Sequence, residues 1–293
     1  MLFRAEAPAK INRELRVGSR RADGFHEIRS RFTAIDLADR LEVEEAGSLE
    51  ISTSGIPVPE GDSNLVARAA RALAEELGIA ARARIHLEKR IPVGAGLGGG
   101  SADAAVALLL LSRLWEAPLP EADLARVAAC VGSDVPFFIY GGEADVTGRG
   151  ERVTPREDTP AREILLLVPP FPIATADVYA AYSKRTGGSA RLPDALEIDA
   201  TRDFLGPNDL ASAVLDTNPE MVDYVRSARE LAKESGITGS GSALVLCGVD
   251  AEGERRLAAT HPGASLHRVR TLSREDYRHR TTQGGGPEWK SPR

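Results

Sequence analysis

Apolar and polar residues alternate along several short stretches of the chain, as they do in half-buried strands. The clearest examples are residues 40–44 (RLEVE) and 49–53 (LEIST). A continuous apolar run at 163–168 (EILLLV) instead indicates a strand buried on both faces. The predicted strands are residues 9–17, 32–37, 40–44, 49–53, 83–91, 163–168 and 243–249.

Longer stretches follow the helical period and end at helix breakers. Residues 62–64 (DSN) offer N-cap candidates for a helix that Gly78 would end. The predicted helices are residues 65–77, 101–115, 121–131, 177–185 and 218–234. Because helices and strands do not alternate as regular βαβ units, the pattern predicts an α+β (mixed α/β) fold.

The composition changes near the middle of the chain. Residues 148–162 are rich in charge, glycine and proline, which indicates a domain boundary. We therefore expect a first domain over residues 1–155 and a second over 156–280. Residues 281–293 contain GGGP and no periodicity, which is typical of a disordered tail.

Charge and hydrophobicity exclude several classes of partner. The net charge of -6 gives no basic field to hold a nucleic-acid backbone. The longest apolar run, 104–111, is far shorter than the roughly 20 residues that cross a bilayer. Cys130 and Cys247 lie in apolar stretches and are expected to be buried free thiols in a reducing cytoplasm. We expect a cytoplasmic monomer or homodimer that binds small molecules.

The strongest chemical signal is the segment 92–105 (PVGAGLGGGSADAA). Five glycines within seven positions let the backbone adopt positive φ and approach a ligand closely. The following helix presents unpaired N–H groups and the positive end of its dipole, so the segment predicts a polyphosphate site. Ser101 could add its hydroxyl to a phosphate or to Mg²⁺. The residues predicted to form this site are Pro92, Val93, Gly94, Ala95, Gly96, Leu97, Gly98, Gly99, Gly100, Ser101 and Ala102.

Other interpretations of this glycine loop fit less well. The spacing of Gly94, Gly96 and Gly99 satisfies the dinucleotide fingerprint, but no second strand ending in an acid follows the helix. The loop also lacks the Gly-Lys-Ser/Thr ending of a Walker A loop. The remaining alternative is a turn that serves tight packing alone. So many glycines would cost considerable chain entropy for that purpose, and we favour phosphate binding.

Two other segments carry candidate chemistry without being decisive. Lys10 and Asn12 face the same way on a predicted strand, and only five of the 37 basic residues are lysines. That bias suggests a role for a compact ammonium group, although a half-exposed strand lysine is the simpler interpretation of Lys10 alone. Ser133 or Asp134, in GSDVPFF, is by itself most simply a helix N-cap or turn residue.

Taken together, these segments resemble the motif set of the GHMP kinases. The set comprises residues 8–12 (PAKIN), the glycine loop 94–105 and residues 132–138 (GSDVPFF). Residues 20–27 (RRADGFHE) are similar to those of the members that phosphorylate a cytidine-diphosphate-linked polyol in non-mevalonate isoprenoid biosynthesis. The likeness reaches about residue 270, and its further matches are 62–65, 147–151, 175–179, 208–210 and 238–243.

The resemblance implies a two-domain GHMP kinase fold with ATP and substrate in the cleft between the domains. It implies that Asp134 accepts the proton of the substrate hydroxyl while Lys10 stabilises that carboxylate and the developing charge. It also implies ATP with Mg²⁺ as the phosphoryl donor, and Asn64 near the adenine. The substrate-binding residues that it implies are Asn12, Phe25, His26, Thr175, Tyr179, Gly239 and Ser240.

In this comparison Phe25 and Tyr179 would sandwich a cytosine ring, and His26 would bind the base edge largely through its backbone. From the residues alone, core packing of the aromatic rings is an equally good interpretation. The chain departs from the family at Arg13 and Glu14, where apolar residues are usual, and this bears on local strand packing. It also departs at Phe25, where tyrosine is common.

Alternatives of different classes stay open at this point. One is another GHMP enzyme, such as mevalonate, homoserine or phosphomevalonate kinase, or diphosphomevalonate decarboxylase. These enzymes have no cytosine to hold, so Phe25, His26 and Tyr179 argue against them. The other is a nucleotide-binding protein without catalysis, which need not keep both Lys10 and Asp134.

Overall fold

A computed structural model of the protein describes residues 1–59, 61–196 and 204–282. Helices and strands are mixed along the chain, which confirms the predicted α+β class. The strands are β1 Leu2–Arg20, β2 His26–Glu44, β3 Leu49–Gly55, β4 Ala83–Lys89, β5 Glu143–Gly148, β6 Arg152–Pro155, β7 Glu163–Val168, β8 Glu234–Ile237, β9 Leu244–Cys247 and β10 Ser265–Arg270. The helices are α1 Leu65–Leu77, α2 Gly99–Leu114, α3 Glu121–Val131, α4 Val135–Tyr140, α5 Thr175–Thr186, α6 Ala211–Thr217, α7 Met221–Leu231, α8 Ala251–Thr260 and α9 Arg274–Thr282, with the 3-10 turn η1 Gly61–Ser63.

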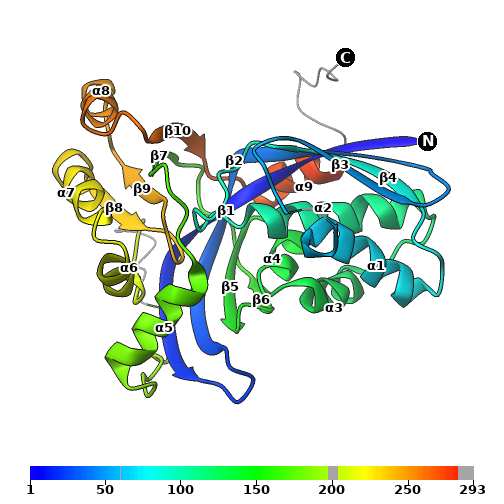
Figure 1. Cartoon of the computed structure of the whole chain (residues 1–293), viewed down its shortest axis with the longest axis horizontal. Coiled ribbons are helices and arrows are strands. Elements are labelled where there is room, and N and C mark those ends of the chain that lie inside the picture. Colours follow the sequence, from blue (N-terminus) through cyan, green and yellow to red (C-terminus); the bar gives the residue numbers. More distant parts are fainter. Residues whose placement is uncertain (60, 197–203, 283–293) are drawn as a thin grey trace.

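The long antiparallel hairpin of β1 and β2 runs across both parts of the molecule (Figure 1). Its pairing extends from Leu2 opposite Glu44 to Arg20 opposite His26. Register shifts, one of them between Asn12 and Glu14, bend it along the way. The sequence predicted shorter separate strands here. The strands are continuous because polar residues that interrupt the alternation are buried and paired instead of ending the strand.

The N-terminal part consists of the sheet β3-β4-β2-β5-β6, to which β1 is added by pairing with β2, and of helices α1 to α4. Helix α2 is the centre of its core, with Leu108, Leu110 and Leu111 fully buried. A helix that is apolar on all sides needs such a position. The glycine loop is therefore held between a half-buried strand, β4, and a buried helix, α2.

The C-terminal part holds the antiparallel sheet β10-β7-β9-β8 with helices α5 to α8 beside it (Figure 1). Strand β7 is buried, as its apolar run predicted. The predicted helix 218–234 is wrong at its end, because α7 stops at Leu231 and Glu234 begins β8. The carboxylate of Glu234 accepts the backbone N–H groups of Phe204 and Leu205, and β8 pairs with β9. These tertiary contacts override the local helical preference.

Helix α9 returns to the N-terminal part of the molecule. Tyr277 is fully buried there, and its hydroxyl donates a hydrogen bond of 2.6 Å to the Phe138 carbonyl. The tail predicted over 281–293 is thus wrong for Thr281 and Thr282, which belong to the helix, while residues 283–293 lie outside the described residues. The division at residue 155 stays a prediction.

Both cysteines are free thiols, as expected, but one expectation about them is wrong. Cys130 is exposed and Cys247 is half-buried. Cys130 lies near the end of α3, on a face of that helix that the core residues Val127, Ala128 and Val131 do not share. The apolar stretch around Cys130 follows a helical period, so only one side of it is buried.

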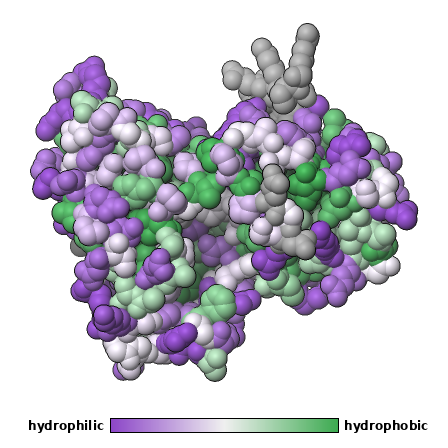
Figure 2. Space-filling view, viewed as in Figure 1, coloured by the Kyte–Doolittle hydropathy of each residue, from purple (hydrophilic) through white to green (hydrophobic). Residues whose placement is uncertain are grey.

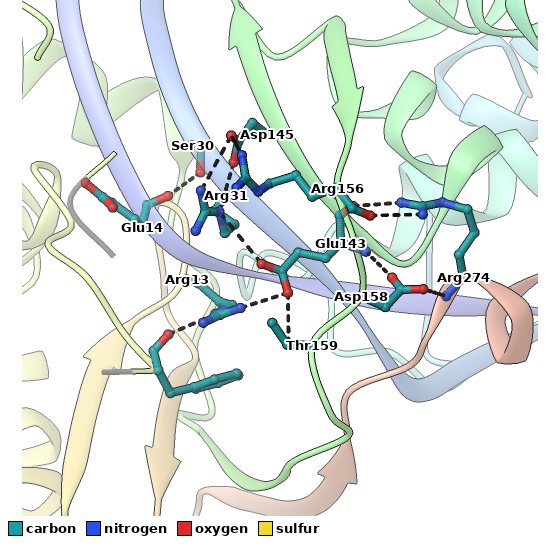
Figure 3. Close-up of polar contacts among 11 residues, drawn as sticks. Arg13, Glu14, Ser30, Arg31, Glu143, Asp145, Arg156, Asp158, Thr159 and Arg274 are labelled. Atoms are coloured by element: carbon teal, nitrogen blue, oxygen red, sulfur yellow. Dashed lines mark hydrogen bonds and ion pairs between the residues drawn. The ribbon is translucent and has the colours of Figure 1, made fainter. Parts of the chain in front are cut away.

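Arg13 and Glu14, the departure from the family pattern, are both buried in β1 (Figure 3). Arg13 pairs with Glu143 at 2.8 Å, donates through Nε to the Phe204 carbonyl at 2.9 Å and stacks on the Phe204 ring. Thr159 also donates to the Glu143 carboxylate. A network of side chains around Glu143 thus satisfies the buried charges that would otherwise make this position costly.

Candidate active site

A cleft of about 1000 Å³ lies between the N-terminal and C-terminal parts, and Figure 2 shows the surface hollowed there. Nearly every predicted site residue lines it. Those residues are Lys10, Asn12, Phe25, His26, Asn64, Pro92, Val93, Gly94, Ala95, Gly96, Leu97, Gly98, Gly99, Gly100, Ser101, Asp134, Thr175, Tyr179, Gly239 and Ser240. Ala102 does not line the cleft, since it is fully buried in α2 with its N–H bonded to the Gly98 carbonyl.

The glycine loop adopts the backbone that its composition predicted. Gly94, Gly96 and Gly98 have positive φ, and a Cβ on Gly96 would lie 2.4 Å from the Thr238 carbonyl oxygen. The loop accepts backbone hydrogen bonds from Ala243, at Ala95, and from Lys10, at Leu97. Helix α2 has no side-chain cap at its N-terminus. Its first N–H groups therefore keep the character of an anion site.

Lys10 lies beneath this loop on β1. Its side chain is only 3% exposed, so the interpretation as a half-exposed strand lysine is wrong. Nζ donates to the Gly96 carbonyl at 3.0 Å and to Asn12 Oδ1 at 2.5 Å, and lies 3.7 Å from Asp134 Oδ2. Burial lowers the pKa of Lys10, and the charge of Asp134 opposes that shift.

Asp134 precedes α4 at the N-cap position but makes no capping hydrogen bond. Its side chain is 31% exposed and faces the cleft. Gly150 approaches so closely that a Cβ there would lie 3.1 Å from Asp134 Oδ1. Burial raises the pKa of Tyr179, and the charge of Asp134 adds to that shift. The carboxylate is thus directed at the cleft instead of closing a helix end.

Aromatic residues occupy the opposite end of the cleft. Phe25 is 48% exposed at the tip of the β1–β2 hairpin, so core packing is the wrong interpretation for this ring. His26 is buried, with Nδ1 2.8 Å from the Gly18 carbonyl and Nε2 2.6 Å from the Ser183 hydroxyl. The Tyr179 ring lies 5.6 Å from the His26 ring, centroid to centroid.

The second glycine-rich loop, residues 238–242, lies against the first. Asn12 donates its backbone N–H to Thr238 Oγ1 at 2.7 Å, and the hydroxyls of Thr175 and Ser240 are 2.8 Å apart. Gly239 has positive φ and packs on the Gly96 carbonyl. Polar groups from β1, α5 and this loop therefore meet beside the phosphate loop.

Asn64 caps α1, as the sequence predicted for this segment. Its Oδ1 accepts the Val66 N–H at 2.9 Å, and its Nδ2 donates to the Pro59 carbonyl at 3.1 Å. The side chain also lines the cleft. Its fixed orientation comes from these local bonds.

Sequence reasoning missed a buried charged cluster, Asp39, Lys89 and Asp103, beneath Gly99. The Lys89 ammonium bonds to the Asp39 carboxylate and to Asp103 Oδ2, the latter at 2.7 Å. Asp39 Oδ1 accepts the Ile91 N–H, and Asp103 Oδ1 has no partner among the described residues. The available signal was that Lys89, another of the few lysines, directly precedes the loop.

The charges of this cluster shift one another's pKa values. Burial lowers the pKa of Lys89, but the two carboxylates outweigh it, and the net shift is upward. Burial and the Asp39 charge raise the pKa of Asp103 well above its usual range, against the opposing effect of Lys89. The cluster thus binds its lysine firmly in the charged form.

No group of three or more His, Cys, Asp or Glu side chains in the described ranges could hold a metal ion. Ser101 lines the cleft in the first turn of α2. Within the same ranges, no helix is long and apolar enough to cross a membrane.

The comparisons with known proteins agree with this arrangement. Residues 64–142 match the family model of the GHMP kinases N terminal domain. The crystal structure of a mevalonate kinase aligns over 93% of this chain and 99% of its own with a TM-score of 0.65 at 15% identity, which shows the same fold. The fold and the glycine loop thus define the class, that of the GHMP kinases.

Relatives with higher sequence identity identify the family within this class. A Pelotomaculum thermopropionicum protein named 4-diphosphocytidyl-2-C-methyl-D-erythritol kinase is 38% identical, covering 89% of this chain and 94% of the relative. A Salinispora arenicola protein of the same name is 39% identical, covering 87% and 86%. The crystal structure of a 4-(cytidine 5'-diphospho)-2C-methyl-D-erythritol kinase aligns over 92% of this chain and all of its own, with 34% identity and a TM-score of 0.75. The chain belongs to the 4-diphosphocytidyl-2-C-methyl-D-erythritol kinase family.

Proposed function

We propose that the protein transfers the γ-phosphoryl group of ATP to the 2-hydroxyl of 4-diphosphocytidyl-2-C-methyl-D-erythritol, giving the 2-phosphate and ADP in non-mevalonate isoprenoid biosynthesis. The observation that carries the proposal is the pairing of Lys10 with Asp134, 3.7 Å apart, in one cleft with the glycine loop and Phe25. The family relationship supports it. The other GHMP activities are not favoured.

The glycine loop holds the triphosphate of ATP. The uncapped N-terminus of α2 offers backbone N–H groups and the positive end of the helix dipole to the phosphate oxygens. Positive φ at Gly96 and Gly98 brings the backbone close to the ligand. Mg²⁺, with Ser101 as a candidate ligand, neutralises phosphate charge when bound. Asn64, fixed as the α1 cap, lies on the adenine side.

Asp134 removes the proton of the substrate hydroxyl as its oxygen approaches phosphorus. The carboxylate is partly exposed to the cleft and unused by α4, so it is available as an acceptor. Lys10 pairs with the Asp134 carboxylate and stabilises negative charge on the transferring group. Its bonds to Gly96 and Asn12 fix the ammonium between the loop and the base.

The nucleotide end of the substrate lies toward the hairpin tip. Phe25 and Tyr179 offer rings for stacking on cytosine, and the buried His26 places its backbone at the base edge. Asn12, Thr175, Gly239 and Ser240 supply the polar groups near the polyol and its phosphates. The Ser240 hydroxyl is held by Thr175, which gives that side of the cleft a defined hydrogen-bond pattern.

The free Cys130 and Cys247 are as expected in a reducing compartment. We place the enzyme in the cytoplasm on that ground. A monomer or homodimer with small-molecule substrates fits the proposal.

A coupled assay of ADP release over a panel of alcohols tests the substrate. We expect turnover with 4-diphosphocytidyl-2-C-methyl-D-erythritol and none with mevalonate or homoserine. Preference for either of those alcohols would overturn the proposal.

The Asp134→Asn variant tests the base. We expect kcat to fall about 10²–10⁴-fold, because a neutral amide cannot accept the proton, while the Kd for ATP stays within about threefold. The matched control is Asp223→Asn, an exposed site on α7, with kcat unchanged. An unchanged rate in Asp134→Asn would remove this residue from the mechanism.

A further inference from the structure

The turn 148–151 between β5 and β6 forms part of the cleft wall next to Asp134. Gly148 and Gly150 both have positive φ, and the Arg149 N–H donates to Glu151 Oε2 at 2.7 Å. Gly150 packs closely on Asp134, since a Cβ there would lie 3.1 Å from Asp134 Oδ1. The turn therefore places its backbone against the base and projects Arg149 from between the two glycines.

Arg149 is half-buried, lines the cleft and connects distant elements. Its guanidinium carbon lies 5.0 Å from the centroid of the Phe25 ring, and its Nη2 donates to the Ala129 carbonyl in α3 at 3.2 Å. In the part of the chain that the structure describes, no carboxylate lies within ion-pair distance of it. The guanidinium therefore lies over the Phe25 ring, and its charge also acts on the Asp23 carboxylate beyond ion-pair distance.

The Phe25 ring contacts the Arg149 guanidinium and is partly exposed. It lies at the hairpin tip with nearly half of its surface exposed. Its backbone is held, since Asp23 Oδ1 accepts its N–H and its carbonyl accepts the Arg21 N–H. Those bonds leave the side chain free to rotate. Stacking against Arg149 restrains that rotation.

We propose that Arg149 is a positioning residue for the nucleotide end of the substrate. Its guanidinium, anchored on α3, holds the Phe25 ring in the orientation that stacks on cytosine. Because Gly150 of the same turn touches Asp134, this turn also sets the position of the stacking ring relative to the base. The inference rests on the proposed function and gives a role to Arg149, which lies within the family match 147–151 but had no role assigned there.

The test is steady-state kinetics of the full chain in which Arg149 is replaced by Met or by Lys. Arg149→Met keeps an apolar stem without the guanidinium, and Arg149→Lys keeps the charge without the planar group. We expect KM for 4-diphosphocytidyl-2-C-methyl-D-erythritol to rise about tenfold in the Met variant and less in the Lys variant. KM for ATP and kcat stay within about threefold. Arg152→Met, an exposed arginine of β6, is the matched control with unchanged constants.

A double-mutant cycle with Phe25→Leu separates action through the ring from direct contact with the substrate. If Arg149 acts through Phe25, adding Arg149→Met to Phe25→Leu raises KM by no more than about twofold. If the fold-changes in KM of the two single variants multiplied in the double variant, the proposal would be overturned. It would also be overturned if kcat and both KM values changed together in Arg149→Met, as expected for a structural role. Should Arg149→Met not fold, the cycle is run with Arg149→Lys.

Failure of the inference differs from failure of the proposed function. A wild-type protein that does not phosphorylate the cytidine substrate overturns both. A wild-type protein that does so, with KM unchanged in Arg149→Met, overturns only the role of Arg149.

Discussion

Lys10 and Lys89 are both almost fully buried, and each lies beneath a glycine of the same loop, Gly98 for Lys10 and Gly99 for Lys89. Within the described ranges, Lys10 has a single carboxylate partner, 3.7 Å away and partly exposed, and burial lowers the pKa of Lys10. Lys89 bonds to the buried Asp39 and Asp103, and its pKa is raised. Burial alone therefore does not decide what a lysine does here.

The difference lies in how completely the charge of each lysine is matched. Lys89 is enclosed by Asp39 and Asp103. Without the Lys89 ammonium, these two carboxylates would be buried without a counter-charge. Lys10 lines the cleft, and its carboxylate partner Asp134 is partly exposed there, so its ammonium can respond to charge on a ligand. We infer that Lys89 stabilises the loop and that Lys10 acts on the reaction.

The largest effect is expected for Lys89→Met. Removing the ammonium leaves Asp39 and Asp103 buried side by side, which costs about 3–5 kcal/mol of unfolding free energy. Urea unfolding measures the loss, with Lys233→Met, at an exposed lysine, as the control. A loss below about 1 kcal/mol would mean that the cluster is not structural.

The next largest effect is expected for Lys10→Met, which should change the catalytic rate more than the stability. Because the ammonium stabilises charge that develops during transfer, kcat should drop about 10²–10³-fold. The unfolding free energy should fall by only about 1–2 kcal/mol, since Asp134 can be hydrated from the cleft. If Lys10→Met proved as destabilising as Lys89→Met, the contrast between the lysines would be lost.

The smallest effect is expected for Asp103→Asn, as a change in pH dependence. The pKa of Asp103 is raised above its unfolded value of 3.8, so the folded state holds its proton to higher pH than the unfolded state. Wild-type stability from this group therefore falls as pH rises through that window. Asparagine cannot titrate, so the unfolding free energy of the variant should rise relative to that of the wild type as the pH increases above about 4. Urea unfolding at a series of pH values measures this difference. If the difference in unfolding free energy between variant and wild type did not change with pH, the assignment would be contradicted.

Local signals predicted a good part of the fold. The helices at 65–77 and 121–131 have the predicted bounds, because Asn64 caps the first, Gly78 ends it in the left-handed conformation and Pro120 precedes the second. Helix α4 was not predicted, since its six bulky residues have no helical period long enough to be seen. Strand β8 was not predicted, and its first residue, Glu234, fell within the helix expected over 218–234, because the pairing of β8 with β9 is a tertiary contact.

The residues of the candidate site could likewise be predicted only in part. The glycine loop could be recognised from residues alone, and the family motifs pointed to Lys10 and Asp134 and to the aromatic end. The cluster around Lys89 and the role of Arg149 could not be found, because Asp39, Asp103, Ala129 and Phe25 come from separate elements of the chain. Their side chains come into contact only where those elements pack together.

By itself, the sequence determined the chemistry of the phosphate loop, since freedom at positive φ is a property of glycine wherever it stands. Only the tertiary structure decided that Lys10 pairs with a partly exposed carboxylate at the cleft while Lys89 is enclosed by two buried ones. The ionisation and reactivity of a buried lysine depend on the dielectric around it and on the distance to its counter-charges. Those quantities are set by how β1, β2, α2 and α4 pack together.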